Sequence, residues 1–142
     1  MNKTVLIAAF LCPTLGFAGD ITIKDPFVPL APKGVIAHAA YMQVTNTGDT
    51  TRSLIGVAAP DYAMAHIHLS SEKDGVATMT GMDQLDIKPD QTITLEPGGL
   101  HVMLMRPSEP LTLGGTVTFD MQFANGETVA VSAEVVERYG GS

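Results

Sequence analysis

The chain is poor in cysteine, tryptophan and basic residues. Its 142 residues include one cysteine, no tryptophan and eight lysines and arginines together, against 15 aspartates and glutamates. A net charge of −7 repels the phosphate backbone of nucleic acids, so we expect no nucleic-acid partner. The length and a hydrophobic fraction of 45% fit one domain with a single core and exclude a disordered chain.

The first 18 residues have the layout of a secretory signal peptide. One lysine precedes an apolar run, which a proline ends before the sequence Gly16-Phe17-Ala18. The run is far shorter than the roughly 20 apolar residues that a transmembrane helix needs. We therefore expect cleavage after Ala18, which leaves residues 19–142 as one periplasmic domain without a stable membrane anchor.

Cleavage would also remove Cys12, the one cysteine of the chain. A lipid on this thiol is the alternative, but Leu11 before it is not a small residue. The mature chain would then have no disulfide, no thiolate ligand and no cysteine nucleophile. This excludes a blue-copper electron carrier, because such a site requires a thiolate.

The mature chain consists of short β-type segments separated by turn residues, and no long stretch keeps a helical period. Asp74-Gly75 is a hairpin signal, and Asn125-Gly126 predicts a type I′ turn. We expect an all-β fold, an antiparallel β-sandwich or barrel with roughly seven to nine strands. The expected strands are residues 35–45, 52–58, 62–69, 76–79, 91–95, 100–105, 117–123 and 129–135.

Histidines and methionines alternate with other residues along two of these strands, so each set shares one face of its strand. The two sets are Met64, His66 and His68 on one strand and His101, Met103 and Met105 on the other. If the strands are neighbours, two imidazoles and two thioethers can converge on one point. A thioether is a soft, neutral donor that suits Cu(I) and is a poor ligand for Zn, Mg, Ca or Mn.

Methionine on a strand is usually core filler, and a lone histidine is usually structural. Met82 and Met105 stay open between packing and metal binding. We interpret four other residues as structural: His38, Met42, Met64 and Met121.

Four of these residues keep fixed separations. His68, Met79, His101 and Met103 form the pattern H-x10-M-x21-H-x-M, and the run LEPGGLHVMLM surrounds the last two. The pattern resembles the periplasmic copper chaperone family of the PCu(A)C type. The resemblance extends to AYMQVTNTGDTTRSLIGVAAP upstream and to TVTFDMQFANGETVAVSAEV near the end, so it spans most of the mature chain.

The resemblance implies a cupredoxin-like β-sandwich that binds one Cu(I) through His68, Met79, His101 and Met103 and catalyses no reaction. It also implies delivery of copper to accepting proteins, such as oxidase subunit II for its Cu(A) centre or another copper chaperone, or a role in copper homeostasis. We expect a monomer.

The sequence departs from the family pattern in two places. Ser70 stands where many relatives have a methionine, and the sequence stops at Ser142 without the His/Met-rich tail that adds a second copper site in some relatives. We therefore expect one site. His66 is an additional histidine beside the motif, and we expect it to assist a weaker binding of Cu(II).

One alternative is a cupin-like metalloenzyme. It would hold Fe or Mn through His66, His68, Glu72 and His101 and would run oxygen or isomerase chemistry. This alternative leaves both motif methionines without a role and lacks the glycines that bracket cupin motifs. A structural or adhesive β-sandwich without a metal is a third possibility.

Overall fold

The computed structural model describes residues 19–137, and the expected leader with its cleavage position lies outside them. The described residues form ten strands and contain no helix that could span a membrane. The strands are β1 Ile21–Pro29, β2 Ala37–Asn46, β3 Arg52–Ala58, β4 Tyr62–Lys73, β5 Val76–Gly81, β6 Leu85–Ile87, β7 Thr92–Leu95, β8 Leu100–Pro107, β9 Thr116–Phe123 and β10 Thr128–Val136.

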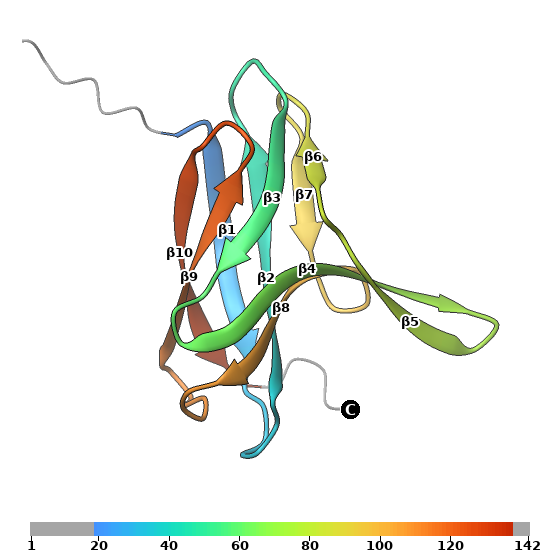
Figure 1. Ribbon diagram of the computed structural model, residues 1–142, viewed down its shortest axis with the longest axis vertical. Helices are drawn as coiled ribbons and strands as arrows, with labels where there is room; N and C mark the ends of the chain where they lie inside the picture. Colours follow the sequence, from blue (N-terminus) through green and yellow to red (C-terminus); the bar gives the residue numbers. More distant parts are fainter. Residues whose placement is uncertain (1–18, 138–142) are drawn as a thin grey trace, which may run out of the picture.

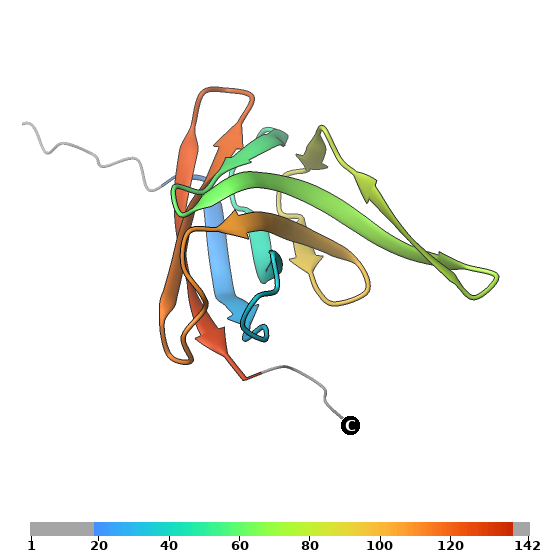
Figure 2. The same cartoon turned by 60° about the horizontal axis from the view of Figure 1, so that its bottom comes forward.

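The strands form one curled sheet in the order β5-β4-β8-β2-β1-β10-β9-β3-β6, with β7 paired to β2 (Figure 1). The sheet has two halves: β5, β4 and β8 form one, and β7, β1, β10, β9, β3 and β6 form the other. Strand β2 pairs with strands of both halves. Residues 37–40 of β2 pair with β8, whereas residues 42–45 pair with β7. The β4–β8 pair therefore crosses obliquely over the strands of the other half, as Figures 1 and 2 both show.

The two halves of the sheet enclose one hydrophobic core. Inward residues alternate with outward ones along β9 and β10, as the sequence pattern predicts. The expectation of one all-β domain is confirmed. The largest fully buried side chains are Phe119, Leu54, Ile87, Leu95, Leu104, Met121, Val28, Val44, Val102 and Asn46.

The eight expected strands are present, but β1 and β6 were not expected. In β1 the sequence Lys24-Asp25-Pro26 interrupts the alternation, and a bulge with a positive φ of 51° at Asp25 absorbs it. Strand β6 has three residues, too few for a pattern. Strand β1 also pairs with β10 in parallel, whereas the other pairings are antiparallel within the described residues.

The two predicted turns have different outcomes. Asp74 and Gly75 both have positive φ values, 53° and 75°, as a tight two-residue hairpin requires. The type I′ prediction for Asn125-Gly126 is wrong, because only Gly126 has a positive φ. The Gly126 amide donates to the Phe123 carbonyl, so a three-residue connection ends in a glycine bulge instead.

Strands β4 and β5 extend beyond the body of the protein as a hairpin (Figures 1 and 2). Every residue from Ser71 to Gly81 is exposed. Apart from the backbone ladder, the Ser71 and Thr78 hydroxyls share a hydrogen bond of 2.9 Å across the hairpin. This arm is therefore held by strand pairing and not by burial in the core.

The side chain of Asn46, the last residue of β2, hydrogen-bonds to backbone groups of the following loop and of β6. Its buried side-chain amide donates to the carbonyls of Thr50 and Ile87 and accepts from the Gly48 amide, at 2.8–3.0 Å. We expect Asn46→Ala to lower the free energy of unfolding by about 2–4 kcal/mol, because buried backbone groups lose their partners. Urea denaturation measures this loss.

The exposed Asn125, which accepts one hydrogen bond from the Glu127 amide, provides the control. Asn125→Ala should cost about 1 kcal/mol or less. Equal losses in the two variants would contradict the role assigned to Asn46.

Candidate metal centre

The pairing of β4 with β8 places two histidines side by side. His68 lies directly opposite His101, and their ring centroids are 5.9 Å apart in an edge-to-face arrangement. Met103 shares the same face of β8 as His101, because side chains alternate along a strand. The condition that these two strands are neighbours, on which the convergence of their donors depends, is therefore met.

Met79 lies on the same face, on β5. It is opposite Ser70 and therefore diagonal to His68, whose direct partner on β5 is Gly81. Diagonal partners in an antiparallel sheet lie about 7–8 Å apart, which a methionine side chain can span. A Cβ on Gly81 would lie 4.0 Å from Nε2 of His68, so the glycine keeps this nitrogen free of a neighbouring side chain there.

We call the outward side of β5, β4 and β8 the donor face, because it carries the four predicted ligands. The reverse side packs against the core through Ile67, Val102 and Leu104, which are at most 2% exposed. On the donor face itself, His101 is 4% exposed and Met79 is 55% exposed. The predicted ligands therefore range from a covered imidazole to an exposed thioether.

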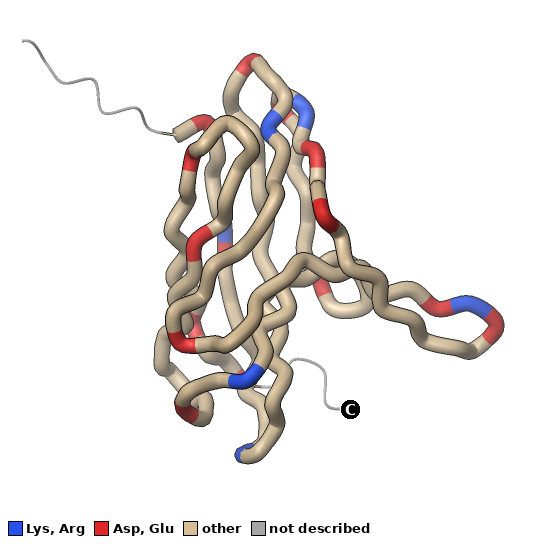
Figure 3. The backbone as a smooth tube through the Cα atoms, in the orientation of Figure 1, with Lys and Arg blue, Asp and Glu red and all other residues tan. Residues whose placement is uncertain are grey.

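The part of the donor face around the four predicted ligands carries no formal charge. Residues 62–71 and 100–105 include no lysine, arginine, aspartate or glutamate, and the charges of β4 gather at the hairpin tip instead (Figure 3). Hard divalent cations prefer carboxylate oxygens, whereas thioethers and imidazoles suit a soft monovalent ion. The chemistry of this face thus fits Cu(I).

The turn before β8 fixes the orientation of His101. Its Nδ1 lies 3.1 Å from the Gly99 carbonyl oxygen. A carbonyl can only accept, so Nδ1 carries the proton and Nε2 presents its lone pair. Metal-binding histidines in proteins are commonly held in this way by a backbone carbonyl.

His68 has the opposite feature, a buried nitrogen without a partner. No hydrogen bond reaches its Nδ1 from the described residues. Burial, and then the neighbouring imidazoles of His101 and His66, lower the pKa of His68 below its ordinary value. A metal ligand must be deprotonated, so the lowered pKa favours the form of His68 that can bind a metal, and a buried polar atom seldom stays unpaired without a reason.

Three residues interpreted as structural are so in the structure. His38 is 5% exposed, and its Nδ1 shares a 2.9 Å hydrogen bond with the Tyr62 hydroxyl. Met42 and Met121 lie in the core. Met82 also packs against the core, so packing is its role.

The interpretation of Met64 as a packing residue is wrong. It is 42% exposed on the donor face and lies opposite the half-buried Met105. His66 is exposed between these methionines and the proposed ligands, and its ring stacks on that of His68 with centroids 6.3 Å apart. Sequence alternation placed Met64 on this face, but the general preference of methionine for cores hid its exposure.

The structure does not assemble the cupin-like alternative. Glu72 lies four residues beyond His68 along β4, about 13 Å away in an extended strand. It faces Ala77 on the projecting hairpin. Among residues 19–137, no three histidine, aspartate or glutamate side chains group closely enough to hold a metal ion.

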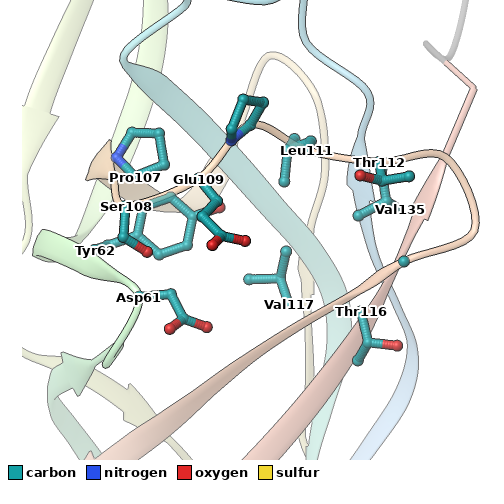
Figure 4. Close-up of a pocket in the computed structure, with 12 residues that line it drawn as sticks. Asp61, Tyr62, Pro107, Ser108, Glu109, Leu111, Thr112, Thr116, Val117 and Val135 are labelled. Carbon is teal, nitrogen blue, oxygen red and sulfur yellow. The ribbon is translucent and has the colours of Figure 1, made fainter.

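A pocket of about 340 Å³ lies at the other end of the β4–β8 pair, where Tyr62 faces Pro107. Asp61, Tyr62 and Glu109 lie toward one end of it and Thr116 toward the other (Figure 4). Burial and the Asp61 carboxylate raise the pKa of Tyr62 to about 12. The lining offers oxygen donors without thioethers or imidazoles, so this pocket does not suit a soft metal ion.

Two solved structures share this fold at comparable sequence identity. The Cu(I)-bound solution structure of DR1885 from Deinococcus radiodurans is 31% identical, with a TM-score of 0.71 over 89% of this chain and 85% of that chain. The copper-bound PCuAC domain from PmoF2 is 26% identical, with a TM-score of 0.70 over 84% of this chain and 94% of that domain.

A curated relative and a family profile agree on the family. A Leifsonia xyli subsp. xyli protein described as "Putative lipoprotein Lxx21020" is 29% identical over 119 residues, which cover 83% of this chain and 70% of the relative. The profile described as "Putative lipoprotein LpqE-like" matches residues 21–135. With this match over most of its length and a fold shared with PCuAC domains, the chain belongs to the LpqE-like family.

Proposed function

We propose that the protein is a copper chaperone that binds one Cu(I) tightly through His68, Met79, His101 and Met103. The observation that carries this proposal is the β4–β8 register, which sets His68 opposite His101 between stretches, residues 62–71 and 100–105, that have no charged side chain. The two similar structures described as copper-bound support the same cargo.

The donor set explains a preference for the reduced ion. Two neutral imidazoles and two thioethers leave a single positive charge on bound Cu(I), whereas Cu(II) would keep two charges without a carboxylate to balance them. Thioethers are also poor ligands for the harder ion. Cu(II) should bind more weakly and depend on the imidazoles, with help from His66.

The arrangement suits transfer rather than turnover. Met79 is more than half exposed on an arm outside the core, so an incoming ligand can replace it first. The covered His101, held by the Gly99 carbonyl, would be the last ligand to leave. We propose acceptors that offer thiolate or imidazole ligands, such as oxidase subunit II or another copper chaperone, and we propose no catalysed reaction.

We place the protein in the periplasm, released by cleavage of its leader. The layout of residues 1–18 supports export. The family name and the Leifsonia relative both refer to lipoproteins, which are exported proteins of the cell envelope. Whether a lipid is attached decides between a free and an anchored carrier.

The first prediction separates ligands from packing residues. Met79→Leu and Met103→Leu each keep the side-chain size but remove the sulfur. Each should weaken Cu(I) binding at least about tenfold, or about 1.4 kcal/mol, and change Cu(II) binding far less. Anaerobic competition titration with a Cu(I) chromophore measures the Cu(I) affinity, and titration against a Cu(II) competitor measures the Cu(II) affinity.

Met82→Leu is the matched control, because Met82 packs against the core and should leave both affinities unchanged. Equal losses for both oxidation states in the Met79 and Met103 variants would contradict thioether ligation. Metal analysis of the protein after anaerobic purification should find copper; iron or manganese would favour the cupin-like alternative.

The second prediction concerns pH. His68 and His101 must be neutral to bind Cu(I), so affinity should fall as the pH drops, by up to two protons per metal ion. Burial and the two neighbouring imidazoles lower the pKa of His68, so its proton competes only below the ordinary histidine value of about 6.5. Competition titrations between pH 7.5 and 5 measure the slope of affinity against pH.

His101→Gln should halve that slope and weaken binding at neutral pH, whereas His66→Gln should preserve most of both. The reverse result would assign the ligand to His66 and refute the proposed set.

The third prediction concerns the leader. The mature protein should begin at Gly19, because the small residues 16–18 precede that position. Intact-mass spectrometry of the exported protein gives its first residue. A mass that retains Cys12 with attached acyl chains would show an anchored lipoprotein instead.

A further inference from the structure

The donors on the β4–β8 pair continue beyond the proposed ligands. The next pair on this face after His68–His101, toward the start of β4, is His66 opposite Met103, and the pair after it is Met64 opposite Met105. The donor face thus carries three successive cross-strand pairs made only of imidazoles and thioethers. The proposed tight site uses the first pair and one member of the second, which leaves Met64, His66 and Met105 unused.

We propose that Met64, His66 and Met105, the outer triad, form a second and weaker Cu(I) position through which copper passes on its way to or from the tight site. This proposal rests on the proposed function, because it gives the same cargo a route. Its donors are neutral and soft, like those of the tight site.

The exposure of the triad argues for a ligand role and against a packing role. Met64 is 42% exposed and His66 is exposed. The alternate residues of β4, Ala65 and Ile67, lie on the core side instead. A methionine that only filled the core would lie on that reverse side. The thioether of Met64 instead lies where a copper ion can reach it.

The neighbouring strand leaves room above the triad. On the other side of β8, Ala37 of β2 lies opposite Met105 and Ala39 lies opposite Met103. Each alanine contributes only a methyl group to this face. Directly opposite the two thioethers, β2 therefore presents only methyl groups, and the Tyr41 ring further along β2 lies beside His101, with ring centroids 6.4 Å apart.

The spacing fits a short transfer step. Successive pairs on one face of an antiparallel sheet lie about 7 Å apart along the strands. His66 lies between the two positions, opposite Met103 and one step from Met64. An ion could therefore exchange Met103 for the triad donors without leaving the donor face.

The triad should bind more weakly than the tight site. It has three donors where the tight site has four, and it lacks a covered imidazole such as His101. Weak binding is what a transfer position requires, because a tight one would trap the metal.

The test is an anaerobic Cu(I) titration read by native mass spectrometry and by competition with bicinchoninate. Wild-type protein should take up one tightly held copper and a second one that bicinchoninate removes at least about tenfold more easily. The double variant Met64→Leu/Met105→Leu should keep the tight copper with its affinity within about twofold and lose the second. The control Met82→Leu should keep both.

The converse variant distinguishes this proposal from the proposed function. Met79→Leu should weaken the tight copper and leave the second one in place. Absence of any tight copper in wild-type protein would refute the proposed function. A tight copper without a second one, or a second one that survives in the double variant, would refute the triad.

Discussion

The candidate site depends on one constraint, the register between β4 and β8. Side chains on paired strands alternate between two faces, so a shift of one residue would turn His68 toward the core and Ile67 toward solvent. The buried contacts of Ile67, Val102 and Leu104 oppose such a shift. The same hydrophobic packing that stabilises the fold therefore holds the two imidazoles opposite each other.

A second constraint comes from the way β2 divides its pairing. Its first half pairs with β8 and its second half with β7, so the two parts of the sheet meet along this strand. At the far end of β2 the buried Asn46 hydrogen-bonds to backbone groups of the following loop and of β6. Strand β8 of the donor face is thus paired with a strand whose far end Asn46 holds in place.

Much of this arrangement could be predicted from the sequence, because it depends on local alternation. The alternation in residues 62–69 and 100–105 predicted that histidines and methionines share one face of each strand, and the resemblance to the PCu(A)C family implied His68, Met79, His101 and Met103 as the ligands. Alternation alone does not tell which strands pair, so the contact of His68 with His101 stayed conditional until the topology was known. The parallel pairing of β1 and the exposure of Met64 depend on contacts between segments that are distant in the sequence. A local sequence pattern therefore cannot predict them.

The projecting β4–β5 hairpin has a consequence for the energetics of the carrier. Its residues from Ser71 to Gly81 are all exposed, so the arm that holds Met79 contributes little buried surface. Local opening of this arm would break strand hydrogen bonds without exposing the core, and such openings have much lower free energies than global unfolding. Backbone amides of the arm should therefore exchange with solvent far faster than those of β9 and β10. For the proposed site, Met79 can then move away while the domain remains folded, so loss of the metal would leave the fold ready for another ion.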